Sequence, residues 1–445
     1  MTALSRRSFL AASAAVPALL ASGRPTAAGD DRPAVTAPRA TSFDNRVEPN
    51  WDERLTISVG PKDADIVGTS HKAVQAAVNY VASLGGGTVL LRPGQYVFRG
   101  AVHLQSHVRL RGTTDDTVIT KIPSRTTKLV ADSDWYDQEL TFAPGHGFEI
   151  GDSICLRMKN PHHGGQDVLK RRLVARSGDR FKLDRALKEN VWEVGTPTVQ
   201  ALFPLLTGEE IEGIAIEQLT LDGDRANNEN LDGNYAGCVF LQDCRDIRIR
   251  DVTACNYNGD GLSWQICHDV TVEDCRSTGH AGLGLHPGSG SQRPWIRRNR
   301  LADNSIGIFF CWGVKFGLAE ENVCEGNRVG ISIGHRDTDN LIRRNRVTGS
   351  GEVGLLFRPE RGPSFCAHRN VIEENTLVDN GGKGAAAIDV QGGTESVTLR
   401  KNAVQERRGA DERIGIRLGG LTKDIRLVEN VVEGFAKDVV QMPQA

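Results

Sequence analysis

The sequence predicts an all-β fold of short strands stacked in parallel coils, a β-solenoid, and two repeating patterns support this prediction. In the C-terminal half, a short apolar segment that opens with a small residue recurs about every 21–33 residues. These segments begin at Gly237, Gly261, Gly282, Gly307, Gly330, Gly354, Ala387 and Gly415. A second register of polar residues follows short alternating strands and consists of Asp274, Asn299, Asn322, Asn345, Asn375, Asn402 and Asn430.

The repeat length and the alternation within each segment decide the kind of repeat. Helical repeats are excluded because they need about 33–47 residues per unit. In stacked coils, an Asn amide can hydrogen-bond to its copies above and below. Because strands alternate faces, the large apolar second and fourth residues should point inward: Leu262/Trp264, Leu283/Leu285, Ile308/Phe310, Ile331/Ile333, Leu355/Phe357, Ile388/Val390 and Ile416/Leu418. The third and fifth residues then form the outward face, where a functional site is expected.

Composition and the N-terminus limit the class of protein. The 445 residues include 49 glycines and carry a formal net charge of -2, so they indicate a glycine-rich globular β protein without the basic excess of nucleic-acid binders. Ser5-Arg6-Arg7-Ser8-Phe9-Leu10 and the alanine-rich run to about Ala21 resemble a twin-arginine export signal. The run is too short for a membrane-spanning helix. We expect residues 1–40 to be a signal peptide and disordered leader, and the protein to be periplasmic or secreted.

The nine cysteines are an odd number for an exported chain, so at least one thiol is expected to stay unpaired within the chain. Cys244 and Cys267 align on adjacent coils, about 4.8 Å apart, which suits either a disulfide or two stacked buried thiols. We favour the thiols. The sequence contains no Cys-x-x-Cys pair, which argues against a structural zinc site.

The N-terminal part predicts a helix over Thr69–Leu84, which ends at three consecutive glycines. This arrangement resembles the start of right-handed parallel β-helices of the pectate lyase-like superfamily, in which an amphipathic helix caps the open end of the core. The resemblance covers most of the mature chain and implies a single β-helix domain over residues 41–445. Residues 126–192 break the periodicity and predict a small β insertion. Its His162 and His163 are more often solvated than ligands.

Three strings resemble successive motif coils of polygalacturonases, in the same order: Asn258-Gly-Asp-Gly-Leu-Ser, Gly330-Ile-Ser-Ile-Gly334 and Gly354-Leu-Leu-Phe-Arg358. Two departures follow. His280-Ala281 stands where those hydrolases carry paired aspartates, and the glycine-flanked histidine before Gly330 is missing. Since inverting hydrolysis needs two carboxyl groups about 6.5–9.5 Å apart, the hydrolytic pair cannot be carried over.

The outward face and its rim gather titratable residues on neighbouring coils. Our catalytic candidates are His286, His335, Arg358, Asp337, Asp260 and Glu360. Arg358 could neutralise a uronate carboxylate bidentately while His286 or His335, near its ordinary pKa, removes the adjacent proton, which is β-elimination chemistry. Trp312 is the candidate platform for sugar stacking. The substrate-binding candidates are Gln265, Trp312, Arg336, Phe309 and Gln391.

The leading hypothesis is an exported polysaccharide lyase acting on a uronate-containing glycan. An inverting glycoside hydrolase using Asp260, Asp337 and Glu360 and a non-catalytic glycan-binding module remain as alternatives. No cofactor is expected to be required. The acidic turn from Asp222 and Asp224 onward could hold Ca²⁺, although such residues also favour turns, and glycan lyases resembling this chain often use calcium. Both a monomer and a homotrimer stay open.

Overall fold

The computed structural model describes residues 50–444 except residues 114–115, 161 and 360–362. The chain divides into two compact units, Met1–Asn50 and Trp51–Ala445, and everything described below belongs to the second. The expected signal peptide and leader lie outside the described residues and stay a prediction. Within the described part, no helix is long and apolar enough to cross a membrane.

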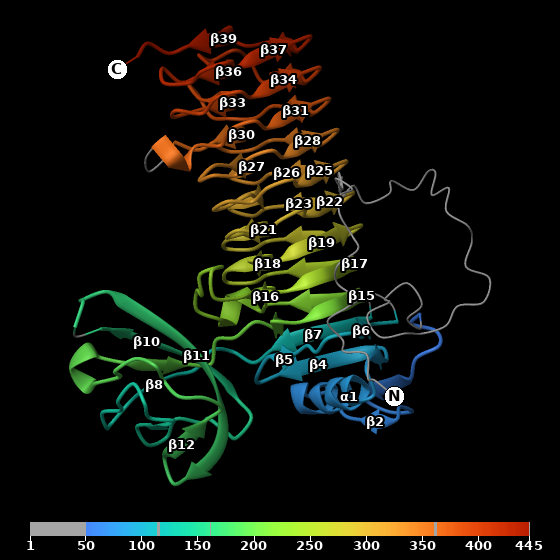
Figure 1. The fold of residues 1–445 in the computed structure, drawn as a ribbon, viewed down its shortest axis with the longest axis vertical. Coiled ribbons are helices and arrows are strands. Elements are labelled where there is room, and N and C mark those ends of the chain that lie inside the picture. The colour runs from blue at the N-terminus through green and yellow to red at the C-terminus, as the bar shows by residue number, and fades with distance from the viewer. Residues whose placement is uncertain (1–49, 114–115, 161, 360–362, 445) are drawn as a thin grey trace, which may run out of the picture. The chain divides into compact units, whose positions relative to one another are not determined.

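The second unit is built around two parallel sheets whose strands stack coil on coil (Figure 1). In the C-terminal half, each coil contributes two short strands to a 22-stranded sheet and one strand to an eleven-stranded sheet. The eleven-stranded sheet consists of β5 (Val102–His103), β14 (Leu206–Glu209), β16 (Gly237–Gln242), β18 (Asp260–Gln265), β21 (Leu283–Gly288), β24 (Ile306–Phe309), β27 (Val329–Ile333), β30 (Val353–Phe357), β33 (Ala386–Val390), β36 (Ile414–Leu418) and β39 (Lys437–Gln441).

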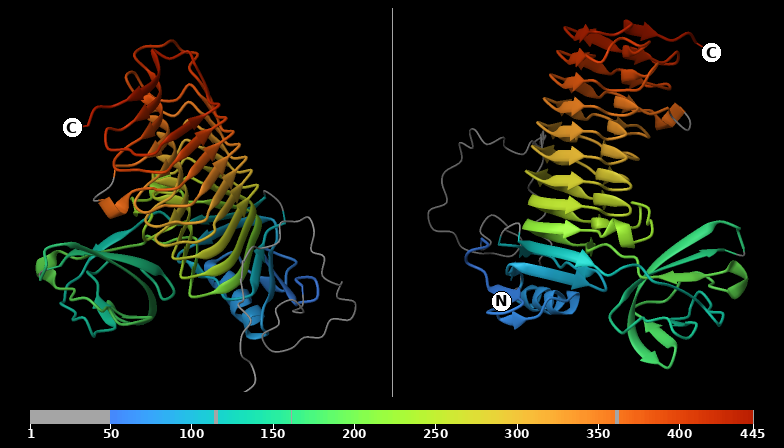
Figure 2. Two further views of the ribbon diagram at one scale, coloured as in Figure 1. Left: turned by 45° about the horizontal axis from the view of Figure 1, so that its top comes forward. Right: turned by 180° about the vertical axis from the view of Figure 1, so that it is seen from behind.

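The 22-stranded sheet forms the other long face of the stack, which is seen from behind in Figure 2. Its strands are β1 (Thr56–Gly60), β2 (Ile66–Val67), β3 (Gly87–Leu91), β4 (Gly94–Phe98), β6 (Val108–Arg111), β7 (Thr117–Lys121), β15 (Glu212–Asp222), β17 (Arg245–Cys255), β19 (His268–Glu273), β20 (Arg276–Thr278), β22 (Trp295–Arg297), β23 (Arg300–Ala302), β25 (Leu318–Glu320), β26 (Val323–Glu325), β28 (Leu341–Arg343), β29 (Arg346–Thr348), β31 (Val371–Glu373), β32 (Thr376–Val378), β34 (Thr398–Arg400), β35 (Ala403–Gln405), β37 (Arg426–Val428) and β38 (Val431–Glu433). Among the residues that the structure describes, short 3₁₀ turns lie at Glu193–Gly195, Arg225–Asn227 and Pro363–Phe365.

The register of the eleven-stranded sheet confirms the inward face and corrects one coil. Leu262 pairs with Leu285 and Leu285 pairs with Ile308, and all three are fully buried. Leu283 is half-buried and pairs with Ile306, so Gly284 rather than Gly282 takes the glycine position. A slip of two residues keeps a side chain on the same face of a strand. His286 is therefore on the outward face, as predicted, but it is the third residue of its segment and not the fifth.

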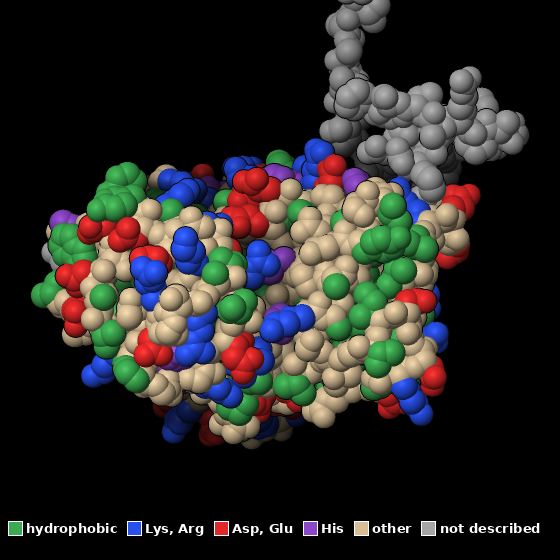
Figure 3. All heavy atoms as spheres, turned by 90° about the horizontal axis from the view of Figure 1, so that it is seen from below, with side chains coloured by type: hydrophobic (Ala, Val, Ile, Leu, Met, Phe, Trp, Pro, Cys, Tyr) green, Lys and Arg blue, Asp and Glu red, His purple; other side chains and the backbone are tan. Residues whose placement is uncertain are grey.

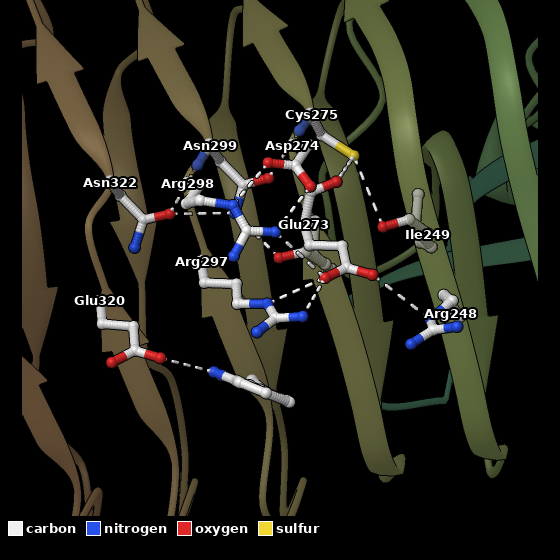
Figure 4. A network of polar contacts seen from close by, with 12 residues as sticks. Arg248, Ile249, Glu273, Asp274, Cys275, Arg297, Arg298, Asn299, Glu320 and Asn322 are labelled. Carbon is white, nitrogen blue, oxygen red and sulfur yellow. Dashed lines mark hydrogen bonds and ion pairs between the residues drawn. The ribbon is translucent and has the colours of Figure 1, made fainter. Parts of the chain in front are cut away.

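Asparagine ladders hold the turns between coils together, as predicted. The backbone N and the Nδ2 of Asn299 both donate to Asn322 Oδ1 at 3.0 Å, and the pattern continues through Asn345, Asn375, Asn402 and Asn430. Asp274 was wrongly placed in this register. Cys275 N donates to Asn299 instead, and Asp274 pairs with Arg298 outside the ladder (Figure 4). A buried ladder needs both a donor and an acceptor on each side chain, and a carboxylate offers only acceptors.

Charged side chains on the outer face of the 22-stranded sheet neutralise one another (Figure 4). Glu273 accepts from Arg297 and Arg298 and pairs with Arg248. Glu320 accepts from Trp295 Nε1 at 3.0 Å and from Arg343. Burial raises the pKa of Glu320, but these hydrogen bonds and the arginine charges outweigh it and lower the pKa. The charged side chains on this face therefore stabilise the fold. We look for the functional site on the eleven-stranded sheet.

The predicted capping helix is confirmed as α1 (His71–Ser83). The Ser70 side chain caps its N-terminus by accepting from Ala73 N, and Val74, Val78 and Val81 are buried in the main core. These apolar side chains cover the first coil, whose inward residues would otherwise face water. Seen from below, this end of the molecule carries charged, polar and apolar side chains interspersed (Figure 3).

The β insertion forms a separate antiparallel sheet with its own core, which includes Phe142, Phe148 and Phe181. It ends at Gln200, later than expected, because β13 pairs back onto β8 and β10. Lys170 Nζ donates to Tyr235 O at 2.8 Å and stacks over Phe240 at 3.9 Å, so the insertion covers the outward face of β16. Its strands are β8 (Thr126–Lys128), β9 (Glu139–Thr141), β10 (Ser153–Lys159), β11 (Gln166–Ser177), β12 (Arg180–Leu183) and β13 (Thr198–Gln200).

Two further predictions can be compared with the structure. Cys244 and Cys267 are stacked buried thiols, as favoured, and Cys244 N donates to Cys267 Sγ at 3.4 Å. His162 Nε2 lies 2.9 Å from Asn190 Nδ2, and His163 pairs with Asp167 at 3.7 Å. Among the residues that the structure describes, no three His, Cys, Asp or Glu side chains are grouped to hold a metal ion.

Candidate active site

A groove of about 440 Å³ lies over the outward face of β18, β21 and β24. The turns that follow β24 and β27 form one side, and the segment before β16 forms the other. The polar and aromatic residues that line it are Asn230, Asp232, Asn234, Asp260, His286, Ser289, Phe309, Cys311, Trp312 and His335. The groove brings together Asp260, His286, His335, Phe309 and Trp312 of the predicted site.

A buried carboxylate–imidazole pair forms the floor of this groove. Asp260 is 1% exposed and His286 is 3% exposed, and His286 Nδ1 donates to Asp260 Oδ2 at 2.7 Å. Asp260 Oδ1 accepts from Leu283 N at 2.9 Å, which fixes the carboxylate in place. A Cβ at Gly233 or Gly282 would overlap with this carboxylate, so only glycine lets the two neighbouring turns close around it.

The environment of His286 decides its charge. Burial by itself would lower the pKa of His286, but the hydrogen bond to Asp260 and the contact with Cys311 outweigh it and raise the pKa to about 9. The prediction of a histidine near its ordinary pKa is therefore wrong for His286, which is an imidazolium at neutral pH. Its Nε2 has no hydrogen-bond partner, although the side chain is buried. The ring thus keeps one buried N–H donor unused at the floor of the groove.

Arg358 does not present two free N–H donors, which the predicted bidentate contact with a uronate carboxylate requires. Its Nη1 donates to Ser332 Oγ at 2.7 Å, and its Nη2 donates to Phe310 O at 2.8 Å. The guanidinium also stacks over Phe309, 4.2 Å from the ring centroid. Burial lowers the pKa of Arg358 against the opposing charge of Asp337. The side chain reaches back across two coils and packs over Phe309, so its donors are used within the β-helix.

Asp337 is fully buried beneath the groove rather than lining it. Its Oδ1 accepts from Gly313 N and Val314 N at 2.9 Å, and its Oδ2 accepts from Gly334 N at 2.8 Å. Burial raises the pKa of Asp337 to about 7 against the Arg358 charge and these backbone donors. The carboxylate holds two turns together, which contradicts a catalytic role at the surface. Glu360 lies outside the described residues.

The aromatic end of the groove is formed by Trp312 and His335. Trp312 is 38% exposed, and its ring meets His335 at 5.4 Å and Phe365 at 5.6 Å between centroids. Arg336 stacks over Phe365 at 4.0 Å and donates to Ser364 O, so it supports this cluster from outside the groove. Phe309 lies between His286 and Arg358, with its ring centroid 5.3 Å from that of His286.

Two of the predicted binding residues do not reach the groove. Gln265 is 7% exposed and packs beneath Gly288. Gln391 Nε2 donates to Asp389 Oδ2 at 2.6 Å, three coils beyond Phe309. Gln391 is hydrogen-bonded to its neighbour Asp389, whereas the buried Nε2 of Gln265 has no hydrogen-bond partner.

The turn predicted to bind calcium uses its carboxylates locally. Asp222 Oδ1 accepts from Asp224 N at 2.9 Å, and Asp224 Oδ1 accepts from Asn227 Nδ2 at 2.7 Å. These contacts fit an Asx turn better than a set of oxygen ligands around an ion. The calcium dependence of activity stays a prediction.

Asn230, Asp232, Gly233, Asn234 and Cys311 also line the groove, but they were not among the site residues predicted from the sequence. Cys311 could have been found, because it follows Phe309 at the next outward position. The segment before β16 carried no repeat signal, and only the folded chain brings it over the groove.

Residues 237–432 match the family model described as the right handed beta helix region. The protein is a right-handed parallel β-helix. Its resemblance to the pectate lyase-like superfamily is thereby confirmed for the fold. The groove lies on one long face of this β-helix, where neighbouring coils repeat the same strand positions.

Comparison with curated proteins finds mannuronan C5-epimerases of Azotobacter vinelandii. The β-helix is 28% identical to Mannuronan C5-epimerase AlgE2 over 181 residues, which are 40% of this chain and 16% of that protein. It is 26% identical to Mannuronan C5-epimerase AlgE5 over 216 residues, 44% of this chain and 19% of that one. The β-helix therefore spans less than a fifth of the length of these relatives.

Solved structures resemble the β-helix over most of its length. The Azotobacter vinelandii mannuronan C-5 epimerase AlgE4 A-module gives a TM-score of 0.52 at 16% identity, covering 87% of this chain and 100% of that one. The Streptococcus pneumoniae surface adhesin PfbA gives a TM-score of 0.50 at 13% identity, covering 86% and 93%. At such identities the likeness concerns the fold alone, since the same β-helix supports different functions.

Proposed function

We propose that this protein is a carbohydrate-active enzyme that binds a uronate unit of a polysaccharide in its groove and removes the proton at C5. The buried Asp260–His286 pair carries this proposal. A cation held in a dry site by its own carboxylate is costly unless it is used, and perturbed titratable groups cluster at catalytic sites. A glycan-binding module would need no such group.

His286 would act first as an electrostatic group. His286 lines the groove, and its buried Nε2–H, which has no hydrogen-bond partner, would donate to a uronate carboxylate bound there. Neutralising that carboxylate lowers the barrier to removing the C5 proton, because the negative charge that develops spreads onto the carboxylate oxygens. A preorganised donor in a site of low dielectric is worth more than the same donor in water.

His335 is our candidate for the base, since a base that starts as an imidazolium cannot accept the proton. It lines the same groove, next to Trp312. Imidazole is the side chain most often used as a general base near neutral pH. Trp312 would stack on the apolar face of a pyranose ring and orient C5 toward this base.

The carbanion formed at C5 has two fates. Loss of the C4 oxygen cleaves the chain by β-elimination, as the sequence led us to expect. Return of a proton to the opposite face of C5 inverts the sugar without cleavage, and the similarity to mannuronan C5-epimerases favours this as the second candidate. Hydrolysis is disfavoured, because Asp260 is bound to His286 and Asp337 is buried.

The proposal is tested by incubating the protein in D₂O with mannuronan and a panel of uronate-rich and neutral polysaccharides, with and without calcium. Deuterium at C5, ultraviolet absorbance of an unsaturated uronate and reducing ends are followed together. Ultraviolet absorbance with reducing ends identifies a lyase, and C5 deuterium without cleavage identifies an epimerase. Reducing ends alone would identify a hydrolase, and binding without any reaction a module; either result overturns the proposal.

Matched histidine variants make the assay specific. His286→Gln is expected to lose activity, whereas His368→Gln should retain it, because His368 lies outside the groove, where its Nδ1 accepts from Glu395 N.

Export by the twin-arginine route belongs to the same proposal and is tested by cell fractionation after Arg6→Lys and Arg7→Lys substitution. Light scattering measures whether the protein is a monomer or a trimer.

A further inference from the structure

A second cavity lies between the insertion and the β-helix, and we call it the junction pocket. It has a volume of about 80 Å³ and is lined by residues of β5, β10, β11 and β14, with none of the described residues that line the groove among them. Strand pairing connects its His103 to the groove along one row of the eleven-stranded sheet: His103, Thr207, Phe240, Ser263 and His286. Four coil spacings of about 4.8 Å separate the ends of this row by about 19 Å. The junction pocket is therefore a separate site on the face that carries the groove.

Positive charge exceeds negative charge around the junction pocket. Four cationic side chains and two carboxylates line it, namely Lys170, Arg171, Arg172 and Arg185 against Asp184 and Glu209. Lys170 donates to Tyr235 O and Arg171 donates to Ala186 O, so neutral backbone oxygens hold both of these cations. Burial lowers the pKa of Lys170 to about 8, which leaves it mostly charged at neutral pH. A cavity with such an excess attracts anions.

Two buried nitrogen atoms at the junction pocket have no hydrogen-bond partner among the described residues, His103 Nε2 and Arg172 Nε. Arg172 Nε lies 3.5 Å from Asp184 Oδ2, which makes an ion pair without a hydrogen bond. His103 is held through its backbone, because its N donates to Gln75 Oε1 at 2.7 Å and its O accepts from Gln75 Nε2 at 2.9 Å. Since buried polar atoms are normally hydrogen-bonded, these two atoms indicate a ligand.

The size and the outer side of the junction pocket also suit a small anionic group. One water needs roughly 10–15 Å³, so about 80 Å³ holds several atoms of that size. Arg185 pairs with Glu209 at 3.6 Å, and both side chains are about half exposed. Such a pair contributes little to stability, so Arg185 can turn toward a ligand at small cost.

We propose that the junction pocket is an oxyanion-binding site that takes the carboxylate of an acidic sugar, with Arg172 and His103 as its donors. Arginine presents planar N–H donors that match the two oxygens of a carboxylate. Burial, followed by the charge of Arg172, lowers the pKa of His103 to about 4, and a neutral imidazole can donate through Nε2. That the anion belongs to a sugar rests on the proposed function, whereas the binding of an oxyanion does not.

The test titrates the protein calorimetrically with sodium glucuronate, glucose and sodium sulfate at constant ionic strength. Glucuronate is expected to bind and glucose is not. Arg172→Gln should weaken glucuronate binding on the order of ten-fold, because it removes a hydrogen bond to a charged group. Arg180→Gln is the matched control and should bind like the wild type, since Arg180 pairs with Glu139 on the same insertion, outside the junction pocket. Tighter binding of sulfate than of glucuronate would overturn the sugar assignment, and binding of neither anion would overturn the site.

The variant His286→Gln separates this site from the groove, where we also place a uronate carboxylate. Glucuronate binding at the junction pocket should persist in His286→Gln. Binding that is lost in His286→Gln but kept in Arg172→Gln would overturn the proposal. Binding that persists in His286→Gln, in a wild type without any C5 exchange, would instead refute the proposed function alone.

Nuclear magnetic resonance of the His103 ring locates the bound anion. Saturating glucuronate should raise the pKa of His103, because a neighbouring negative charge stabilises the imidazolium. An unchanged pKa of His103 at saturation would place the ligand elsewhere and overturn the proposal. Should Arg172→Gln fail to fold, this titration of the wild type and the calorimetry of the half-exposed Arg185→Gln still decide the outcome.

Discussion

Replacing Asp260 with Asn should remove the positive charge of His286 and with it most of the activity. Asn keeps the size of the side chain but cannot hold a cation by its charge. Without the hydrogen bond and the charge of Asp260, burial is the largest influence left on His286, and it lowers the pKa of His286 from about 9 in the wild type. The rise of the wild-type pKa from the ordinary 6.5 to about 9 corresponds to about 3 kcal/mol, because one pKa unit is worth about 1.4 kcal/mol. We expect the C5 exchange rate at neutral pH to fall on the order of a hundred-fold.

The pH dependence of C5 deuterium exchange tests this reasoning directly. In the wild type, activity should decline as the pH rises through about 9, since His286 then loses its proton. In Asp260→Asn, the same decline should move to lower pH. Asp389→Asn is the matched control. Like Asp260, Asp389 is a buried carboxylate on the outward face of the eleven-stranded sheet, but it pairs with Arg417 and lies outside the groove.

An increase of wild-type activity as the pH rises through 9 would refute the assignment, because it would make neutral His286 the base. An unchanged pH profile in Asp260→Asn would refute the claim that Asp260 sets the charge of His286. A profile that moves equally in Asp389→Asn would show a general electrostatic effect instead of the specific pair.

The remaining predictions concern stability and substrate binding. Because folding raises the pKa of His286, the protonated side chain should contribute roughly 3 kcal/mol to the free energy of unfolding below pH 6.5. This contribution should be lost as the pH rises through about 9, which thermal unfolding of wild type and His286→Gln will measure. Arg358→Ala leaves Asp337 buried without its cation and should lower the free energy of unfolding in urea by about 3–5 kcal/mol, against about 0–1 kcal/mol for the exposed Arg328→Ala. Asn345→Ala interrupts the ladder and should lower it by about 2–4 kcal/mol, whereas Asn79→Ala on the exposed side of α1 should change it by less than about 0.5 kcal/mol. Trp312→Ala should raise KM about ten-fold with little change in kcat in steady-state assays; a loss confined to kcat would contradict a stacking role.

The fold could be read from local patterns. Alternation of period two places side chains such as Leu262 and Ile331 on one face regardless of the rest of the chain, and both are buried. Repetition of Asn at one turn position predicts a ladder, because identical coils stack identical groups. The capping helix followed from its own apolar stripe. Each of these signals depends only on residues close in sequence.

The tertiary structure alone decided which outward residues act together. His286 was predicted to face outward, but its charge depends on Asp260, which lies one coil away. Arg358 and Asp337 carry the residue types of a catalytic site, yet their donors and acceptors are used by neighbouring coils. Charge, burial and hydrogen-bond occupancy depend on distances across coils, and no single segment of the sequence contains them.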